Sequence, residues 1–209
     1  MKLIKVLVFG ACVATLTACS GVDMVMRNAP LETPRIDSIT VPQVARDYNL
    51  HSIRFAVPTT LTVSEANTYY PIADIVWRGD PLGKRAEQIS DIFQTSIMAS
   101  GAGLTGRVPV TVDVELVRFH SLTQRTRYSV GGVHSIKFDL TIRDAASGEA
   151  LEPTRRINAD LAALGGRAAM AADSEGQTQK VRITAHLTNL FLQELSGYQG
   201  VSPNAALGS

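Results

Sequence analysis

The sequence predicts an α+β fold: a two-layer sandwich in which an antiparallel sheet of about four strands carries two helices on one face. Residues 108–162 contain three segments with alternating apolar and polar side chains, which is typical of strands with one buried face. Segments near 81–100 and 177–196 repeat apolar residues at helical spacing, so each helix has one apolar side. The order along the chain is therefore β-α-β-β-β-α, and helices and sheet can bury their apolar faces against each other.

The first part of this domain is expected to supply one strand and the first helix. Apolar and polar residues alternate over 52–57, which predicts a strand, and short strands could form at 59–63 and 73–77. Asp80 suits the N-cap of the helix, because its carboxylate can accept from free backbone N–H groups. Pro81 suits the first helical position.

Three strands and the second helix follow. The alternation is clearest over 108–116 and 136–143, and a third strand is expected near 149–162. Residues 118–134 form either a long hairpin tip or a bulged strand. The stretch 163–176, rich in Gly and Ala, is expected to be a loop before the second helix.

The first 18 residues have the features of an export signal. Two lysines precede an apolar stretch that is too short and too interrupted for a membrane-spanning helix. The stretch ends in Leu16-Thr17-Ala18-Cys19, which resembles the lipobox of bacterial lipoproteins. This resemblance implies cleavage before Cys19 and attachment of lipid to its thiol. Each buried methylene of such a lipid contributes roughly 0.8 kcal/mol, so two or three acyl chains would hold the protein at a membrane.

The lipobox divides the chain into four parts. Residues 1–18 are the signal peptide, and 19–45, where proline recurs, are the lipidated N-terminus and an extended tether. Residues 46–197 form the α+β domain, and 198–209 are expected to be a disordered tail. In lipoproteins of this kind an Asp after the cysteine retains the protein in the inner membrane. Ser20 stands there instead, which favours the outer membrane over the inner membrane. The domain is expected at the periplasmic face.

Charge and cysteine content exclude several classes of function. The chain has 20 basic and 19 acidic residues, and loss of Lys2 and Lys5 with the signal leaves a net charge near −1. This balance argues against nucleic-acid binding, which needs a basic surface. The two cysteines are Cys12, inside the signal, and Cys19, so the domain has no cysteine for a disulfide, a redox centre or a metal.

No catalytic motif is recognisable, and an enzymatic function is not expected. The sequence lacks a Gly-x-Ser-x-Gly nucleophile elbow, a phosphate-binding loop and a His-Glu-x-x-His metal motif. His120 and His134 could meet across a hairpin, but they are better interpreted as two unrelated surface residues. We therefore expect neither a metal nor a cofactor.

An aromatic segment is the first candidate interaction surface. Tyr69, Tyr70 and Trp77 are three of the chain's six Trp and Tyr residues, and Arg78 follows them. Aromatic and Arg side chains are enriched at the centres of protein interfaces. The alternative is that Trp77 closes one end of the core.

A cationic segment, residues 118–134, is the second candidate. It contains Arg125 and Arg127 together with a further arginine, a tyrosine and two histidines. These cations could contact an anionic lipid or a protein partner. The alternative is that they are the polar end of an exposed hairpin.

Two resemblances bear on function. The lipobox, the tether and the order of strands and helices resemble small envelope lipoproteins that assist larger machines, such as the lipopolysaccharide-assembly lipoprotein and the auxiliary lipoproteins of ABC-type lipid transporters. The runs Val76-Trp77-Arg78-Gly79-Asp80-Pro81 and Val130-Gly131-Gly132-Val133-His134-Ser135 resemble an uncharacterised lipoprotein family of alphaproteobacteria, which brings no known activity. No functional residue except Cys19 can be carried over.

These resemblances imply a non-enzymatic accessory or binding subunit of a cell-envelope assembly or transport system. Its partners would be the membrane, through the lipid on Cys19, and an envelope protein. One alternative is a lipoprotein that binds a small molecule or a lipid between its helices and its sheet. Another is a hydrolase whose site no motif reveals. Fold resemblance alone does not choose among these functions.

Overall fold

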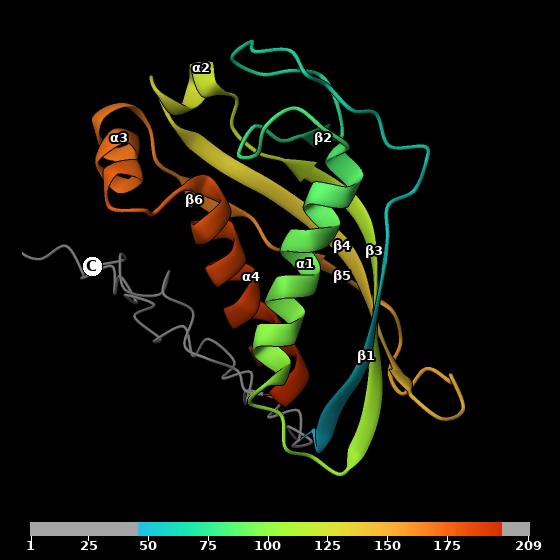
Figure 1. The fold of residues 1–209 in the computed structure, drawn as a ribbon. Coiled ribbons are helices and arrows are strands. Elements are labelled where there is room, and N and C mark those ends of the chain that lie inside the picture. The colour runs from blue at the N-terminus through green and yellow to red at the C-terminus, as the bar shows by residue number, and fades with distance from the viewer. Residues whose placement is uncertain (1–45, 198–209) are drawn as a thin grey trace, which may run out of the picture. The chain divides into compact units, whose positions relative to one another are not determined.

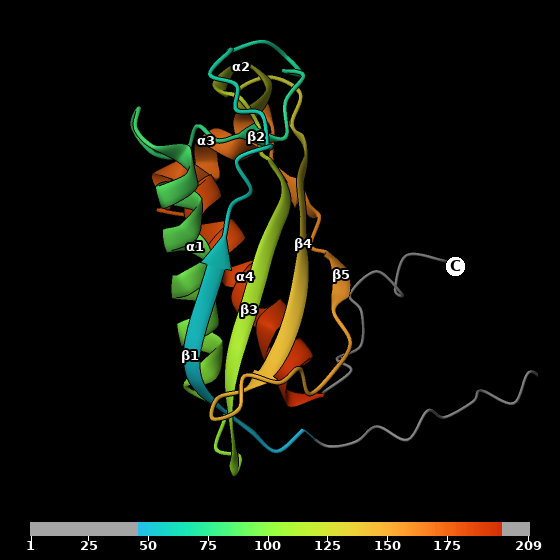
Figure 2. The ribbon, with the colours of Figure 1, turned by 90° about the vertical axis from the view of Figure 1, so that its right-hand side faces the viewer.

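The computed structural model describes residues 46–197 (Figure 1). The predicted signal peptide, the lipidated Cys19, the tether and the C-terminal tail lie outside these residues. A sheet forms one layer, and two long helices, α1 (Arg85–Gly101) and α4 (Gln179–Ser196), lie together over one face of it (Figures 1 and 2). The predicted α+β class is confirmed.

The sheet has six strands, where the sequence predicted about four. The strands are β1 (Tyr48–Ala56), β2 (Ile75–Val76), β3 (Val108–His120), β4 (Gly132–Asp144), β5 (Arg155–Asn158) and β6 (Leu161–Ala163). Their order is β1-β3-β4-β5, with β2 pairing to β3 and β6 to β4. β1 and β2 pair with successive parts of β3. β5 and β6 likewise pair with successive parts of β4, in the same register. The six strands therefore fill four positions across the sheet.

The expectation of a wholly antiparallel sheet is wrong. β3 and β4 are antiparallel, but β1 and β2 both run parallel to β3. The connection explains this, because α1 carries the chain back along the face of the sheet between β1 and β3 (Figure 1). β3 consequently starts at the same end as β1, as a crossover helix requires.

The core between the helices and the sheet is apolar. Phe93 of α1 lies at its centre and is fully buried. Its ring centroid lies 4.7 Å from that of Phe55 in β1 and 5.2 Å from that of Phe138 in β4. Phe191 of α4 completes the group at 6.1 Å. Offset and edge-to-face pairs of this kind add stability to the burial of apolar area.

Residues 118–134 combine the two predicted alternatives. A β-bulge between Leu116 and Arg118 shifts the alternation by one residue, which places Phe119 in the core. After β3, a single helical turn, α2 (Gln124–Arg127), leads into β4. The segment is therefore a bulged strand followed by a compact connection.

Asp80 does not cap α1 as predicted. The helix begins at Arg85, and its N-cap is Lys84, which makes no side-chain cap bond. The Asp80 carboxylate accepts from Trp77 Nε1 at 2.8 Å and from Lys180 Nζ at 2.9 Å. Its oxygens thus join the chain before α1 to the start of α4, and this tertiary role replaces the local one.

Two further segments differ from prediction. Residues 163–176 are not simply a loop, because they contain the short helix α3 (Gly166–Ser174). Its four alanines favour a helix. The glycines on either side disfavour one, which is why the sequence predicted a loop. The strand expected over 149–162 is shorter and interrupted: Asp160 Oδ1 accepts from Ile136 N at 2.9 Å between β5 and β6.

Candidate interaction surface

The aromatic segment 69–78 and the cationic segment 118–134 meet at one end of the domain. β2 pairs with the last residues of β3, which brings the long connection between β1 and α1 against the connection between β3 and β4. Both connections lie at the end of the sheet opposite to the start of β1 (Figures 1 and 2). The structure therefore joins two candidates that the sequence presented separately.

Three hydrogen bonds hold the two connections together. Each joins the region of α2 to the chain just before or within the tyrosine pair. They are Thr123 Oγ1 to Thr68 O at 2.7 Å, Thr126 Oγ1 to Tyr69 O at 2.6 Å, and Arg125 N to Asn67 Oδ1 at 2.9 Å. Because two of the acceptors are backbone carbonyls, these bonds fix the path of the chain that presents the tyrosines.

Tyr69 and Tyr70 are exposed, yet their neighbours hold them in place. The guanidinium carbon of Arg125 lies 4.8 Å from the centroid of the Tyr69 ring, where the ring face attracts a cation. Tyr70 stacks on His120 with ring centroids 4.5 Å apart, and its hydroxyl oxygen accepts from Arg118 Nη2 at 3.0 Å. A partner that binds these ordered side chains would lose little further conformational entropy.

Large apolar side chains are exposed at the same end. Of the 13 large hydrophobic residues that are exposed within residues 46–197, eight lie in segments 58–84 and 128–133, and Ile72 is 98% exposed. Apolar side chains exposed in a group, with polar residues around them, mark interaction sites. We refer to Tyr69, Tyr70, Ile72 and Arg125 as the tip surface.

Trp77, Arg78 and Arg127 do not belong to the tip surface. Trp77 is fully buried, so it packs in the core. The side chain of Arg78 is 18% exposed and binds Glu65 at 3.2 Å. Arg127 is 2% exposed and binds the carboxylate of Asp173 at 2.6 Å. Arg78 and Arg127 thus form ion pairs within the domain, whereas Arg125 of the tip surface forms none within residues 46–197.

Glu65 ties the long connection that carries the tyrosines to the start of α1. Its carboxylate accepts from Arg85 Nε at 2.6 Å and from Arg85 Nη2 at 2.9 Å. The Arg85 guanidinium holds the pKa of Glu65 below its usual range. The carboxylate therefore remains ionised at neutral pH, and the bidentate pair restrains the base of the tip.

His120 and His134 are buried, so their interpretation as surface residues is wrong. His120 Nε2 lies 2.9 Å from Pro71 O, and His134 Nδ1 lies 2.8 Å from Ser121 Oγ. Within residues 46–197, no group of three His, Cys, Asp or Glu side chains is arranged to hold a metal ion. The two histidines thus have separate hydrogen-bond partners.

The sequence did not reveal a buried Ser121–His134 pair, which invites comparison with a hydrolase site. Ser121 Oγ also donates to Gln179 Oε1 at 3.2 Å, and all three side chains are buried. Burial, with smaller effects from Arg182 and Arg127, lowers the pKa of His134 to about 3. So weak a base does not activate a serine at neutral pH, and the hydroxyl has no exposed face to offer a substrate.

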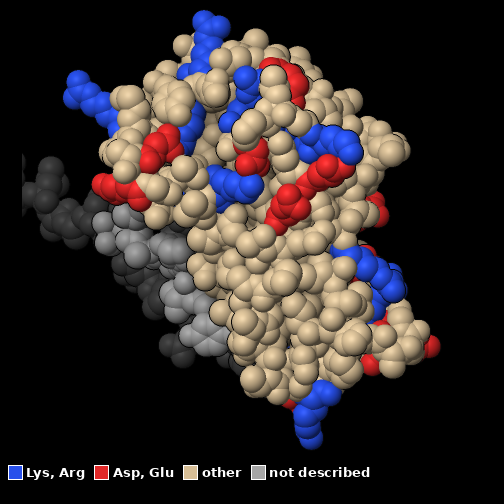
Figure 3. All heavy atoms as spheres, viewed as in Figure 1, with Lys and Arg blue, Asp and Glu red and all other residues tan. Residues whose placement is uncertain are grey.

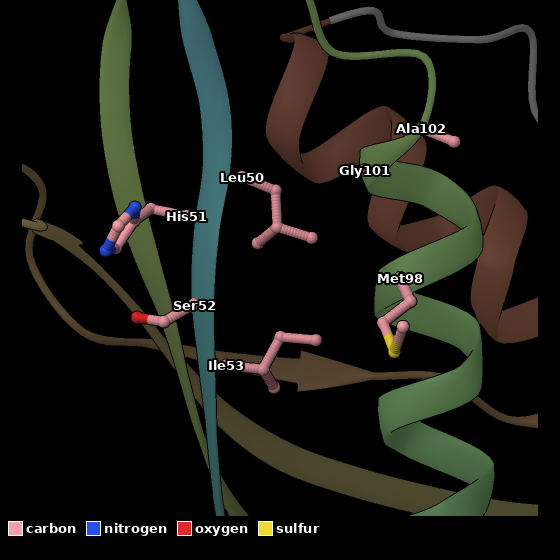
Figure 4. Close-up of a pocket in the computed structure, with 7 residues that line it drawn as sticks. All are labelled: Leu50, His51, Ser52, Ile53, Met98, Gly101 and Ala102. Atoms are coloured by element: carbon pink, nitrogen blue, oxygen red, sulfur yellow. The ribbon is translucent and has the colours of Figure 1, made fainter.

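A shallow groove of about 420 Å³ lies between β1 and α1 (Figure 4). Leu50 and Ile53 point from β1 toward Met98 on α1, whereas His51 points away (Figure 4). The groove adjoins a surface over the lower halves of α1 and α4 that carries almost no charge, and charged side chains gather above it (Figure 3). Its lining is mixed, since Leu50, Ile53 and Met98 are apolar and His51 and Ser52 are polar.

Comparisons with known proteins identify a family. A family of unknown function, DUF6778, matches residues 48–207, and the chain belongs to this family. Membership of an uncharacterised family, expected from the sequence, is confirmed. No curated protein matches the chain. Within residues 46–197, no helix is long and apolar enough to cross a membrane.

Two solved structures show distant likeness. A Xanthomonas campestris protein of the DUF330 family has 9% identity and a TM-score of 0.42, with 71% of this chain and 81% of that chain covered. A Caulobacter crescentus protein, described as a candidate lipoprotein, has 14% identity and a TM-score of 0.31, with 71% and 93% covered. Similarity at this level says nothing about activity.

Proposed function

We propose that the protein is a lipoprotein of the outer membrane, facing the periplasm, and that it acts as a non-enzymatic binding subunit of a cell-envelope system. The tip surface would be the site at which an envelope protein docks. The observation that carries this proposal is the group of exposed, ordered aromatic and cationic side chains at one end of the domain.

The composition of the tip surface supports recognition of a protein. Tyrosine and arginine are over-represented among the few residues that supply most of the binding energy at interfaces. Tyr69 and Tyr70 are 54% and 67% exposed, and each already contacts a neighbour, Arg125 for the first and His120 for the second. Ile72 adds an apolar side chain without any cover from the domain.

The described chain begins at the end of the domain opposite to the tip surface. The start of β1 is at the end away from α2 (Figure 2). A lipid on Cys19 would therefore hold the domain by the end that does not carry the tip surface. Ser20, in place of Asp, supports the outer membrane as the site of anchoring.

Site-specific photo-crosslinking in the native envelope tests the docking site. A photoreactive phenylalanine analogue replaces Tyr70 in one strain and Leu151 in another. Leu151 is a matched control, since it is an exposed apolar residue (42%) in the connection after β4, away from the tip. We expect one discrete protein adduct from position 70 and none from position 151. Equal adducts from both positions, or none from position 70, would refute docking at the tip.

A second experiment tests the anchor separately. Cys19→Ala should leave an unlipidated precursor that is not cleaved after residue 18, because the lipid acceptor is absent. Labelling with palmitate and fractionation of the membranes measure this. A Cys19→Ala protein that is still processed and still fractionates with the outer membrane would contradict the proposed anchor, whatever the crosslinks show.

A further inference from the structure

A polar cluster interrupts the apolar interior at the end near α2 and α3. The start of α4 lies against β6, which pairs with the start of β4, so Arg182 of the helix lies near His134 of the strand. Gln179, at the first position of α4, reaches Ser121. Ser121 links two members of the cluster, since its Oγ lies 2.8 Å from His134 Nδ1 and donates to Gln179 Oε1 at 3.2 Å. Arg127 enters the cluster from α2.

Three buried nitrogen atoms in this cluster have no hydrogen-bond partner within residues 46–197. They are Arg127 Nη1, His134 Nε2 and Arg182 Nη1. Nη2 of each guanidinium is engaged: Arg127 Nη2 binds Asp173 Oδ1 at 2.6 Å, and Arg182 Nη2 binds Ala162 O at 3.2 Å. Buried polar atoms in folded proteins are almost always satisfied by protein, by water or by an ion. The unpaired atoms therefore indicate an occupant.

The charge of the cluster favours an anion over water. Arg127 and Arg182 are always cationic, and the Asp173 carboxylate pairs with Arg127. Arg182 forms no salt bridge with any residue in 46–197, and its Nη1 atom is buried. His134 adds no charge, because burial keeps its pKa near 3. One positive charge is thus left without a partner, and a water molecule would satisfy its hydrogen bonds but not its charge.

We propose that Arg127 and Arg182 form the binding site for a phosphate group, supplied either by a phospholipid headgroup or by free inorganic phosphate. Nη1 of each guanidinium is free to donate, and a phosphate group has several oxygens that can accept charged hydrogen bonds from both arginines. Arg182 is only partly buried, so the site is reached from its side of α4, next to β6. The site is distinct from the tip surface, with which it shares no residue.

Calorimetry on the full lipidated protein in a phosphate-free detergent tests the site. The probes are inorganic phosphate, glycerol 3-phosphate and dihexanoylphosphatidylglycerol, each titrated separately. Arg182→Ala should weaken binding by about tenfold to a hundredfold, since it removes charged hydrogen bonds to the ligand. Arg182→Lys keeps the charge but loses the free Nη1 donor, so it should weaken binding less. Arg156→Ala is the matched control, because that arginine is exposed and pairs with Asp139 on the sheet.

The three probes also separate the two sources of phosphate. Binding of all three supports the phosphate group itself, binding of the lipid alone assigns the site to a headgroup, and binding of inorganic phosphate alone assigns it to the free ion. The proposal is overturned if no probe binds to wild-type protein or if Arg182→Ala and Arg156→Ala bind equally well. A crystal structure in phosphate that shows only water beside Arg182 Nη1 would also overturn it. Circular dichroism confirms that each variant is folded.

Discussion

The ionisation of His134 makes folding stability depend on pH in a range where few other groups contribute. Its side chain is fully buried. Burial, followed by the positive charges of Arg182 and Arg127 and by His186, lowers its pKa from 6.5 to about 3. The ring is therefore neutral in the folded protein, and lowering the pH below 6.5 should destabilise the fold.

The size of the effect follows from linkage. Below pH 6.5 the unfolded chain binds a proton at His134 that the folded protein does not bind until about pH 3. The stability is complete above pH 6.5 and falls by about 1.36 kcal/mol for each pH unit below it. Between pH 7.5 and pH 5.0, His134 should therefore cost the free energy of unfolding about 2 kcal/mol. Burial also lowers the pKa of His186, which acts in the same direction.

Urea unfolding of the full chain at pH 7.5 and pH 5.0 measures this loss. His134→Gln retains a polar group toward Ser121 but cannot take up the proton, so its stability should fall by about 2 kcal/mol less than that of the wild type over this range. Each variant is compared with itself at the two pH values, so a general loss of stability cancels. His51→Gln, at an exposed position on β1, is the control. If His134→Gln loses as much stability as the wild type, the reasoning is refuted.

Two further substitutions test the core and the packing of α1. Phe93→Ala should lower the free energy of unfolding by about 3–5 kcal/mol, because it leaves a cavity among Phe55 and the other core rings; a loss below about 1 kcal/mol in urea unfolding would contradict its central position. Gly101→Ala should cost about 1–3 kcal/mol, since its Cβ would lie 2.3 Å from Leu50 Cδ2. Thermal unfolding measures the second effect, and an unchanged or raised midpoint would show that α1 and β1 are less closely packed than described.

The regular elements could be predicted because their patterns are local. The alternation over 108–116 and the helical spacing over 177–196 each identify an element from its own side chains. The parallel pairing of β1 with β3 depends instead on where α1 places the chain, which no pattern inside either strand records. Asp80 also depends on contacts that its local sequence does not record. It has the residue type of an N-cap, but its carboxylate binds Lys180, which is distant in sequence.

The tip surface was predicted in part, and for a related reason. Tyr69, Tyr70 and Arg125 were singled out by residue type, and they are exposed. Residue type also selected Trp77 and Arg127, which are buried. Their burial follows from tertiary contacts: Trp77 lies against the core, and Arg127 faces a carboxylate on α3, a helix the sequence did not predict. The contact between Tyr69 and Arg125 arises only when β2 pairs with β3.

The apolar and polar side chains of α4 show how stability and binding are separated in this fold. Ile183, Leu187 and the residues that continue their face are fully buried in the apolar core, and they fix the helix on the sheet. The polar cluster at the helix start therefore does not need to stabilise the fold, and buried charges rarely do. Arg182→Ala should thus reduce phosphate affinity far more than it reduces unfolding free energy, whereas Phe93→Ala should do the reverse. An ion network that served folding alone would show no such asymmetry, since removal of Arg182 would then lower stability and leave no ligand affinity to lose.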